Sequence, residues 1–188
     1  MKLRIIAGDL KGRIITLPEK SVRFRPTQGR VRQALAEILK KQIPGAIVAD
    51  LCAGSGAFGF ECLSRGAREA HFVEHDRILA RRISEFIKRF GLEKRAMVHV
   101  QDVRHFSMTC KSSFDIIFYD PPYAENELAG LLPQILELLS PQGTLLHERA
   151  AGKKGAETAQ TAFDSTRYFH ETRNYGDTGT DFYTRRNA

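Results

Sequence analysis

Short apolar runs alternate with segments of helical spacing through most of this chain. The apolar runs predict strands at residues 46–50, 69–74, 96–101, 113–119 and 144–148. Helical spacing predicts helices at residues 57–65 and 77–90, and Asp76 and Gly91 are suited to cap the second of them. Strands that alternate with helices indicate a mostly parallel sheet with helices on both faces, whose ligands gather at the carboxyl ends of the strands.

The two ends of the chain carry different patterns. Residues 4–7 and 13–17 are β-prone and flank a loop with glycine at both ends, which predicts an N-terminal hairpin. Residues 167–173 and 180–185 predict an antiparallel hairpin that completes a seven-stranded sheet. Pro133, inside a leucine-rich segment, indicates either a kink or the start of a helix, and residues 141–143 predict a turn.

One more helix is predicted between the N-terminal hairpin and the sheet. It follows Thr27, which can cap it. Its apolar face is expected to contain Val31, Leu35, Ile38 and Leu39. Pro44 and Gly45 then mark a boundary, so we expect an N-terminal extension at residues 1–44 and an α/β domain at residues 45–188.

The positive charge of the chain is concentrated near its N-terminus. The net charge is +7, yet residues 1–45 hold eleven Lys or Arg against three acidic residues, and the remainder holds eighteen against nineteen. A basic extension on a nearly neutral body is typical of a protein that binds a polyanion. The alternative is a solvated surface that only aids solubility.

Composition narrows the class of protein further. No apolar run is long enough to span a bilayer, and residues 1–9 lack the apolar core of a signal peptide, which predicts a soluble, cytoplasmic protein. The three cysteines have no CxxC spacing, so neither a disulfide framework nor a metal site is expected. We expect a monomer.

The stretch from Asp50 to Gly59 predicts a cofactor loop between a strand and a helix. Its glycines, Gly54, Gly56 and Gly59, also fit the dinucleotide fingerprint. Asp50 favours a different ligand, because a carboxylate repels a pyrophosphate and attracts a cation. S-adenosylmethionine carries a sulfonium and an ammonium and no phosphate, so it suits this loop better. An ordinary strand-to-helix turn capped by Asp50 is the alternative.

Acidic residues end three successive predicted strands. They are Asp50, Glu74 and Asp102, which a parallel sheet brings to one edge. Glu74 can accept hydrogen bonds from ribose hydroxyls, and Asp102 can accept one from an adenine amino group with the Val103 amide facing the ring. Each acid singly can equally well cap the helix that follows it.

The strand at 113–119 leads into Asp120, Pro121, Pro122 and Tyr123. The prolines stiffen the turn, so the Asp120 carboxylate and the Pro121 carbonyl are held as acceptors beside an aromatic ring. Such a site suits the exocyclic amino group of a flat base, stacked on Tyr123. Holding both amino hydrogens redirects the nitrogen lone pair toward a methyl donor. A rigid turn with Tyr123 in the core is the alternative.

The chain resembles the RsmD family of bacterial 16S rRNA methyltransferases nearly from end to end. The matching segments are 4–8 with 11–13, 25–27 with 30–35, 50–57, 64–67, 73–74, 120–123 and 175–178. The resemblance implies a Rossmann-like class I methyltransferase fold and transfer of a methyl group from S-adenosylmethionine, which leaves S-adenosylhomocysteine. The implied acceptor is the N2 amino group of guanine 966 in 16S rRNA of the small ribosomal subunit.

The resemblance and the residue patterns together give three sets of candidate site residues. Those expected at the reacting group are Asp120, Pro121, Pro122 and Tyr123. Those expected at the cofactor are Asp50, Ala53, Gly54, Gly56, Glu74, His75, Asp102 and Val103. Those expected at RNA are Arg4, Lys11, Arg13, Arg23, Arg25, Thr27, Arg30 and Arg32.

Three other functions stay open on the sequence. An adenine-N6 methyltransferase acting on DNA or RNA shares the motif at residues 120–123, and guanine rests on the resemblance alone. An NAD-dependent oxidoreductase could use the same glycine loop. A non-catalytic RNA-binding module would explain the basic extension and leave the motif at residues 120–123 without a role.

Overall fold

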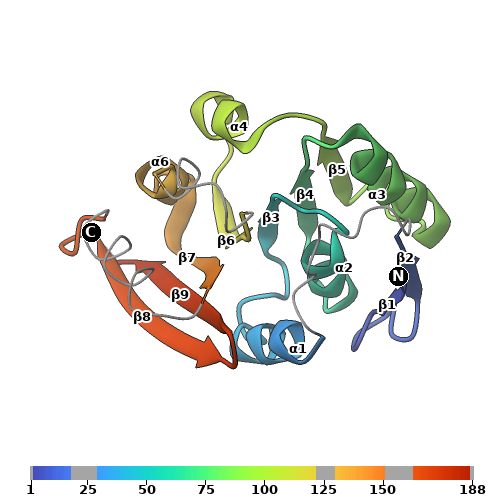
Figure 1. Cartoon of the computed structure of the whole chain (residues 1–188), viewed down its shortest axis with the longest axis horizontal. Helices are drawn as coiled ribbons and strands as arrows, with labels where there is room; N and C mark the ends of the chain where they lie inside the picture. Colours follow the sequence, from blue (N-terminus) through green and yellow to red (C-terminus); the bar gives the residue numbers. More distant parts are fainter. Residues whose placement is uncertain (1, 18–28, 122–129, 151–162, 187–188) are drawn as a thin grey trace.

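The computed structural model describes residues 2–17, 29–121, 130–150 and 163–186, and within them seven strands form one central sheet (Figure 1). Its order is β5-β4-β3-β6-β7-β9-β8. Neighbours from β5 to β7 run parallel, whereas β9 is antiparallel to both β7 and β8. The strands are β3 Ile47–Leu51, β4 Glu69–Val73, β5 Ala96–His99, β6 Phe114–Tyr119, β7 Leu139–Ala150, β8 Tyr168–Tyr175 and β9 Thr178–Arg185.

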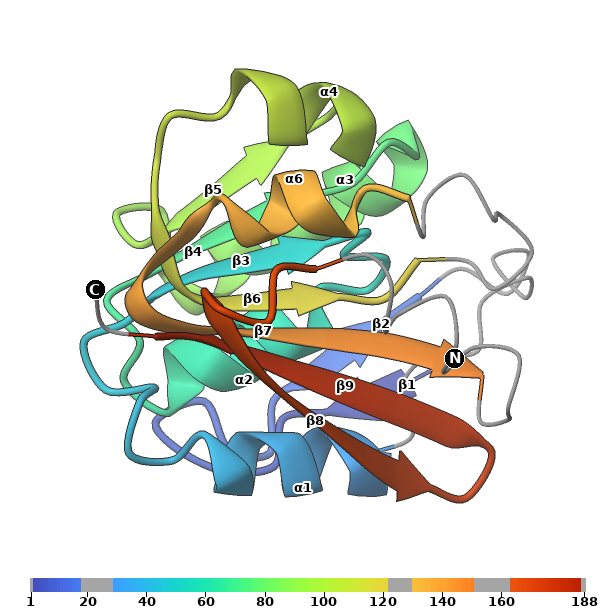
Figure 2. The same ribbon diagram turned by 90° about the vertical axis from the view of Figure 1, so that its left-hand side faces the viewer.

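Helices cover both faces of this sheet and bury two separate apolar clusters (Figures 1 and 2). On one face lie α1 Gly29–Ile38, α2 Ala57–Ser64 and α3 Arg77–Phe90, and on the other lie α4 Val103–Thr109 and α6 Leu132–Leu136. Strands β3 and β6 run parallel, and between them the order in which successive strands are added to the sheet reverses. In a doubly wound sheet this switch point is where ligands bind, so the fold confirms the predicted α/β class and locates its site.

The structure differs from the predicted elements at one helix and one turn, and at Pro133 it selects one of the two predicted alternatives. Helix α4, whose cap is Asp102, was not predicted, because only Val103, Phe106 and Ser107 mark its buried side. The turn expected at residues 141–143 is an irregularity inside β7, where Gln142 takes a φ of 65° and the pairing with β6 shifts register. Pro133 stands at the start of α6 and does not kink a longer helix.

The predicted apolar face of α1 is correct at three positions and wrong at one. Val31, Leu35 and Leu39 are buried, whereas Ile38 is 37% exposed. Arg32, which was expected at the surface, is 3% exposed and donates from Nη2 to the Arg4 carbonyl at 3.0 Å. The guanidinium therefore holds α1 against the N-terminal hairpin from the inside.

The N-terminal hairpin is shorter than predicted because part of it leaves the ladder to bind α2. Strands β1 Lys2–Arg4 and β2 Ile14–Thr16 pair antiparallel. The amides of Ile6 and Ala7 instead donate to the buried Glu61 carboxylate of α2, at 2.9 and 3.1 Å. Apolar residues of the hairpin and α1 join the cluster beneath α2 and α3. The division at residue 45 stays a prediction, and the two parts share this core.

Gly8 packs directly against the end of α2, and we expect Gly8→Ala to push the hairpin loop away from this helix. Gly8 has a φ of 80°, and a Cβ there would lie 1.8 Å from the Ser64 carbonyl oxygen. That oxygen accepts from the Asp9 amide at 2.8 Å, so the loop cannot move aside without losing this hydrogen bond. The expected loss is about 2 to 4 kcal/mol of unfolding free energy, measured by denaturant titration.

Gly12→Ala is the matched control. Gly12 also has a positive φ, 85°, but nothing lies within 4 Å of its Cβ position. This substitution is expected to cost only the left-handed backbone strain of about 1 kcal/mol. Equal losses for the two variants would contradict the steric role of Gly8.

Candidate functional site

The loop after β3 brings the backbone of the glycine motif over the end of the sheet. Gly54 and Gly56 have φ values of 53° and 70°, in the left-handed region that glycine occupies without strain. Gly56 caps the start of α2. Gly59 serves packing, because a Cβ there would lie 2.4 Å from the Phe72 ring and 3.2 Å from Asp50 Oδ2. Two glycines therefore shape the loop and the third brings α2 close to the sheet.

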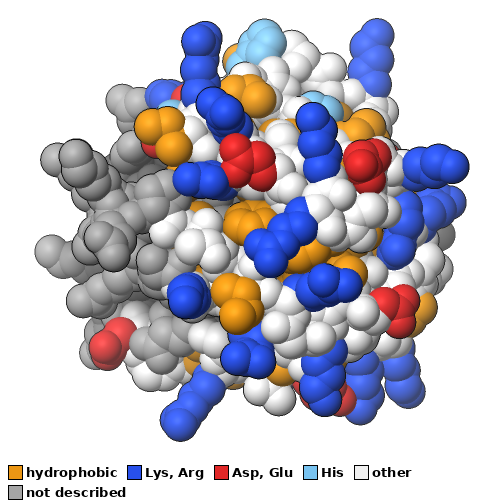
Figure 3. Space-filling model, turned by 90° about the vertical axis from the view of Figure 1, so that its right-hand side faces the viewer, with side chains coloured by type: hydrophobic (Ala, Val, Ile, Leu, Met, Phe, Trp, Pro, Cys, Tyr) orange, Lys and Arg blue, Asp and Glu red, His pale blue; other side chains and the backbone are white. Residues whose placement is uncertain are grey.

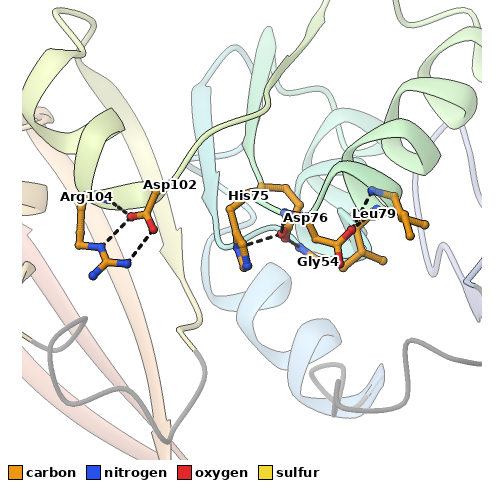
Figure 4. Close-up of polar contacts among 8 residues, drawn as sticks. Gly54, His75, Asp76, Leu79, Asp102 and Arg104 are labelled. Atoms are coloured by element: carbon orange, nitrogen blue, oxygen red, sulfur yellow. Dashed lines mark hydrogen bonds and ion pairs between the residues drawn. The ribbon is translucent and has the colours of Figure 1, made fainter.

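Glu74, directly after β4, organises two loops at once (Figure 4). Its Oε2 accepts from the Gly54 amide at 2.7 Å and its Oε1 from the Asp76 amide at 2.8 Å, and the side chain is 3% exposed. His75 Nδ1 lies 3.3 Å from Oε1, with its own side chain 72% exposed. Asp76 in turn caps α3 by accepting from the Ile78 and Leu79 amides. Glu74 thus fixes the glycine loop to the start of α3.

Asp102 lies at the rim in a different environment (Figure 4). It caps α4, accepting from the Arg104 amide at 2.8 Å, and it pairs with the Arg104 guanidinium at 2.9 Å. This hydrogen bonding to Arg104 lowers the pKa of Asp102 to about 2. Val103, the next residue, is buried in α4. The capping role considered for Asp102 is present, and its predicted contact with a cofactor stays a prediction.

Carboxylates converge where β3 and β6 end. Asp50 accepts from the Gly59 amide at 3.0 Å and is buried. The Asp120 amide, just past β6, contacts the Leu51 carbonyl oxygen at 3.5 Å. Desolvation, together with the negative charges of Asp120 and Glu74, raises the pKa of Asp50 to about 8. This site is therefore short of positive charge, and a cationic ligand would be attracted to it.

Cys52 stands among these acids, which sequence reasoning did not anticipate. Burial and the charges of Glu74, Asp120, Asp102 and Asp50 all raise the pKa of its thiol. Its φ of 59° is left-handed, which is unusual for a residue with a Cβ and places it in the tight turn before Ala53. The Ala53 amide donates to the Val73 carbonyl at 2.9 Å. The sequence offered one indication that Cys52 lies near these acids, namely its position two residues after Asp50.

The remaining predicted residues fall into three groups. Pro121 is buried beside Asp120, and Pro122 and Tyr123 lie outside the described residues. Arg4, Lys11, Arg13 and Arg30 are exposed, unlike the buried Arg32. Arg23, Arg25 and Thr27 lie outside the described residues. The acids and the glycine loop thus lie together at the carboxyl ends of the parallel strands, and Arg32 is buried.

The raised pKa of Asp50 predicts how stability depends on pH. The pKa of this carboxyl is about 8 in the folded protein and about 3.9 in the unfolded chain. The folded protein therefore loses stability as the pH rises between these two values. We expect Asp50→Asn to remove this loss, because the amide oxygen can still accept from Gly59. Thermal melts of the ligand-free protein at pH 5 and pH 8 measure it. Parallel pH profiles for the two proteins would contradict the expectation.

The sheet order, the glycine loop after β3 and the acid after β4 define a Rossmann-like fold of the methyltransferase class. A solved Escherichia coli structure, yhhF, described as a methyltransferase, matches 99% of this chain and 99% of its own with a TM-score of 0.83 and 25% identity. Within the described residues, no helix is long and apolar enough to cross a membrane, and no group of three or more potential metal ligands is found.

Two sequence relatives and one family model agree with this class. The protein YlbH of Bacillus subtilis is 32% identical over 98% of this chain and 100% of its own length. Ribosomal RNA small subunit methyltransferase D of Escherichia coli K12 is 35% identical over 78% of this chain and 71% of its own. The model of the family described as conserved hypothetical protein 95 matches residues 3–184. The chain belongs to this family, the RsmD family of methyltransferases.

Proposed function

We propose that this protein transfers a methyl group from S-adenosylmethionine to the exocyclic N2 amino group of a guanine in 16S rRNA, in the cytoplasm. The observation that carries the proposal is the group of buried or half-buried acids Asp50, Glu74 and Asp120 around the glycine loop. Such a group attracts a sulfonium and an ammonium and repels the pyrophosphate of a dinucleotide. The alternative of an NAD-dependent oxidoreductase is disfavoured on this ground.

Each of the predicted cofactor residues would recognise a different part of S-adenosylmethionine. Glu74 has carboxylate lone pairs beyond those used by Gly54 and Asp76, and these can accept from ribose hydroxyls. Asp102 would accept from the adenine amino group while it keeps its bond to Arg104. Asp50 supports the loop by accepting from the Gly59 amide, and a bound cation would favour the ionised form of this carboxyl.

Asp120 and Pro121 would hold the target amine. The Asp120 carboxylate and the Pro121 carbonyl accept its two hydrogens, which directs the nitrogen lone pair at the methyl group. When bound, the cofactor supplies an electrophilic methyl carbon on a sulfonium. Methyl transfer would form the nitrogen–carbon bond and return the electrons of the sulfur–carbon bond to sulfur, and Asp120 or water would take one amine proton.

The nature of the substrate rests on the relatives. Several are named ribosomal RNA small subunit methyltransferase D, among them the Escherichia coli and Haemophilus influenzae proteins. A more distant structural neighbour, at 16% identity and a TM-score of 0.64, is described as complexed with S-adenosylhomocysteine. Within this rRNA we propose guanine 966 as the target, which is what the family resemblance implies.

The test is methyl transfer to defined acceptors. The protein is incubated with radiolabelled S-adenosylmethionine and small ribosomal subunits that lack the modification, naked 16S rRNA or duplex DNA. Label in the subunits or the rRNA, recovered as N2-methylguanosine after nuclease digestion, supports the proposal. Label recovered as N6-methyladenine, or only in DNA, would identify the adenine methyltransferase instead.

A further inference from the structure

Helix α3 carries an exposed row of cations that belongs to neither the cofactor site nor the predicted RNA-binding extension. Arg77, Arg81, Arg82, Lys88 and Arg89 are all exposed. Glu85 is the acidic residue within α3, and it pairs with Arg82 at 2.8 Å and with Arg81 at 3.3 Å. Among the described residues, Arg77, Lys88 and Arg89 have no acidic partner within ion-pair distance. The exposed side of α3 is therefore strongly positive.

The first turns of this row work against the helix, whereas Lys88 and Arg89 lie in the last turn, where cations favour the helix dipole. Arg77 occupies the first turn, which contains no acidic residue, although a cation there opposes the helix dipole. Arg77 and Arg81 are four residues apart, the spacing at which like charges repel across one helical turn. Neither feature helps α3 to fold, so an anionic partner accounts for them better than the stability of the helix does.

The tertiary structure joins this row to the N-terminal hairpin (Figures 1 and 3). The Arg13 guanidinium lies over the Phe90 ring at the end of α3, 5.9 Å from its centroid. Lys and Arg side chains outnumber acidic ones across the face shown in Figure 3. We define the basic strip as Arg13, Arg77, Arg81, Arg82, Lys88 and Arg89.

The basic strip also begins at the candidate site. The cap of α3, Asp76, is bound to Glu74, so Arg77 stands at the rim, whereas Lys88 and Arg89 lie at the far end of the helix. Ile78, beside Arg77, is 64% exposed and offers an aliphatic surface next to the cations. From Arg77 to Arg89 the helix rises about 18 Å, enough to run beside several phosphates.

We propose that the basic strip docks the RNA backbone that flanks the target nucleotide, leading it from the rim along α3 to the hairpin. This inference rests on the proposed function and adds to it the cations of α3, which lie outside residues 1–44 and continue from Arg13. The partner is RNA because its phosphates complement a long row of guanidinium and ammonium groups, which bind phosphate through charge and hydrogen bonds.

The test reverses charge at the far end of the strip, away from the cofactor. Arg89→Glu and the double variant Lys88→Glu with Arg89→Glu are compared with Lys111→Glu, an exposed residue between α4 and β6 that lies outside the strip. We expect the double variant to raise the KM for RNA substrate at least tenfold, with kcat and S-adenosylhomocysteine affinity unchanged. Lys111→Glu should change none of these values by more than about twofold.

Direct binding keeps this test independent of turnover. Anisotropy of a labelled 16S rRNA fragment is measured at several salt concentrations, and each lost phosphate contact should reduce the slope of log affinity against log salt by about 0.7 to 0.9. Unchanged affinity and slope in the double variant would overturn the docking surface. Absence of methyl transfer by the wild type, with the slope still reduced in the variant, would overturn only the proposed function.

Discussion

Asp120→Ala is expected to lower kcat for methyl transfer by about 10³-fold or more and to leave S-adenosylhomocysteine binding nearly unchanged. Asp120 follows β6 directly, and its amide contacts the Leu51 carbonyl oxygen, so its carboxylate stands beside the end of β3. On the proposed mechanism this carboxylate holds the amine and directs its lone pair. Alanine removes the acceptor, and the amine then binds without the required orientation.

The control separates orientation from charge. Asp120→Asn keeps one acceptor oxygen and nearly the same shape, so it should retain more activity than Asp120→Ala. Single-turnover rates with saturating cofactor, and calorimetric titration with S-adenosylhomocysteine, measure the two steps separately. S-adenosylhomocysteine is the suitable probe because it lacks the sulfonium that Asp120 would attract. Full activity of the alanine variant would exclude Asp120 from the reaction.

Glu74→Gln is expected to weaken S-adenosylmethionine binding by about 100-fold. The carboxylate uses one oxygen for Gly54 and the other for Asp76 and is 3% exposed. Glutamine must turn an NH₂ group toward one of these amide donors, which breaks a charge-assisted hydrogen bond of about 1.5 to 3 kcal/mol. Since each 1.4 kcal/mol is a factor of ten, the loss of this bond alone accounts for a large part of the effect.

Asp102→Asn is the matched carboxylate-to-amide change. Asp102 is 40% exposed and its amide form can still accept from the Arg104 backbone, so we expect less than a tenfold loss of cofactor affinity. Isothermal titration gives both affinities, and far-ultraviolet circular dichroism shows whether each variant is folded. A smaller effect for Glu74→Gln than for Asp102→Asn would contradict the organising role of Glu74.

The sheet and most helices could be predicted because their signals are local. Helix α3 begins and ends where its caps, Asp76 and Gly91, predicted. By contrast, the strand expected at residues 4–7 is correct at Arg4 and wrong at Ile6 and Ala7, because Glu61, more than fifty residues away, accepts from the amides of those two residues. A β-prone run shows that residues can pair, and it does not show which acceptor they will meet.

The candidate site also contains residues that could be predicted from the sequence and residues that could not. Asp50, Gly54, Gly56 and Glu74 could be selected from the sequence, because glycine spacing and acids at strand ends are properties of short segments. Gly59 fits the fingerprint in the sequence, and in the structure its missing side chain lets α2 pack against Phe72. The position of Cys52 among the carboxylates could not be found without the strand order.

The sequence by itself determined the alternation of strands and helices, the glycine loop after the first strand of the sheet and the acids at the strand ends, since each depends on neighbours within a few residues. Only the tertiary structure decided the fate of the charges. In the folded chain Arg32 is buried, and Asp50, Glu74 and Asp120 lie close together. The cations of α3 lie beside Arg13. The reason is physical: electrostatic interactions depend on distance and burial, and the topology of the sheet fixes both.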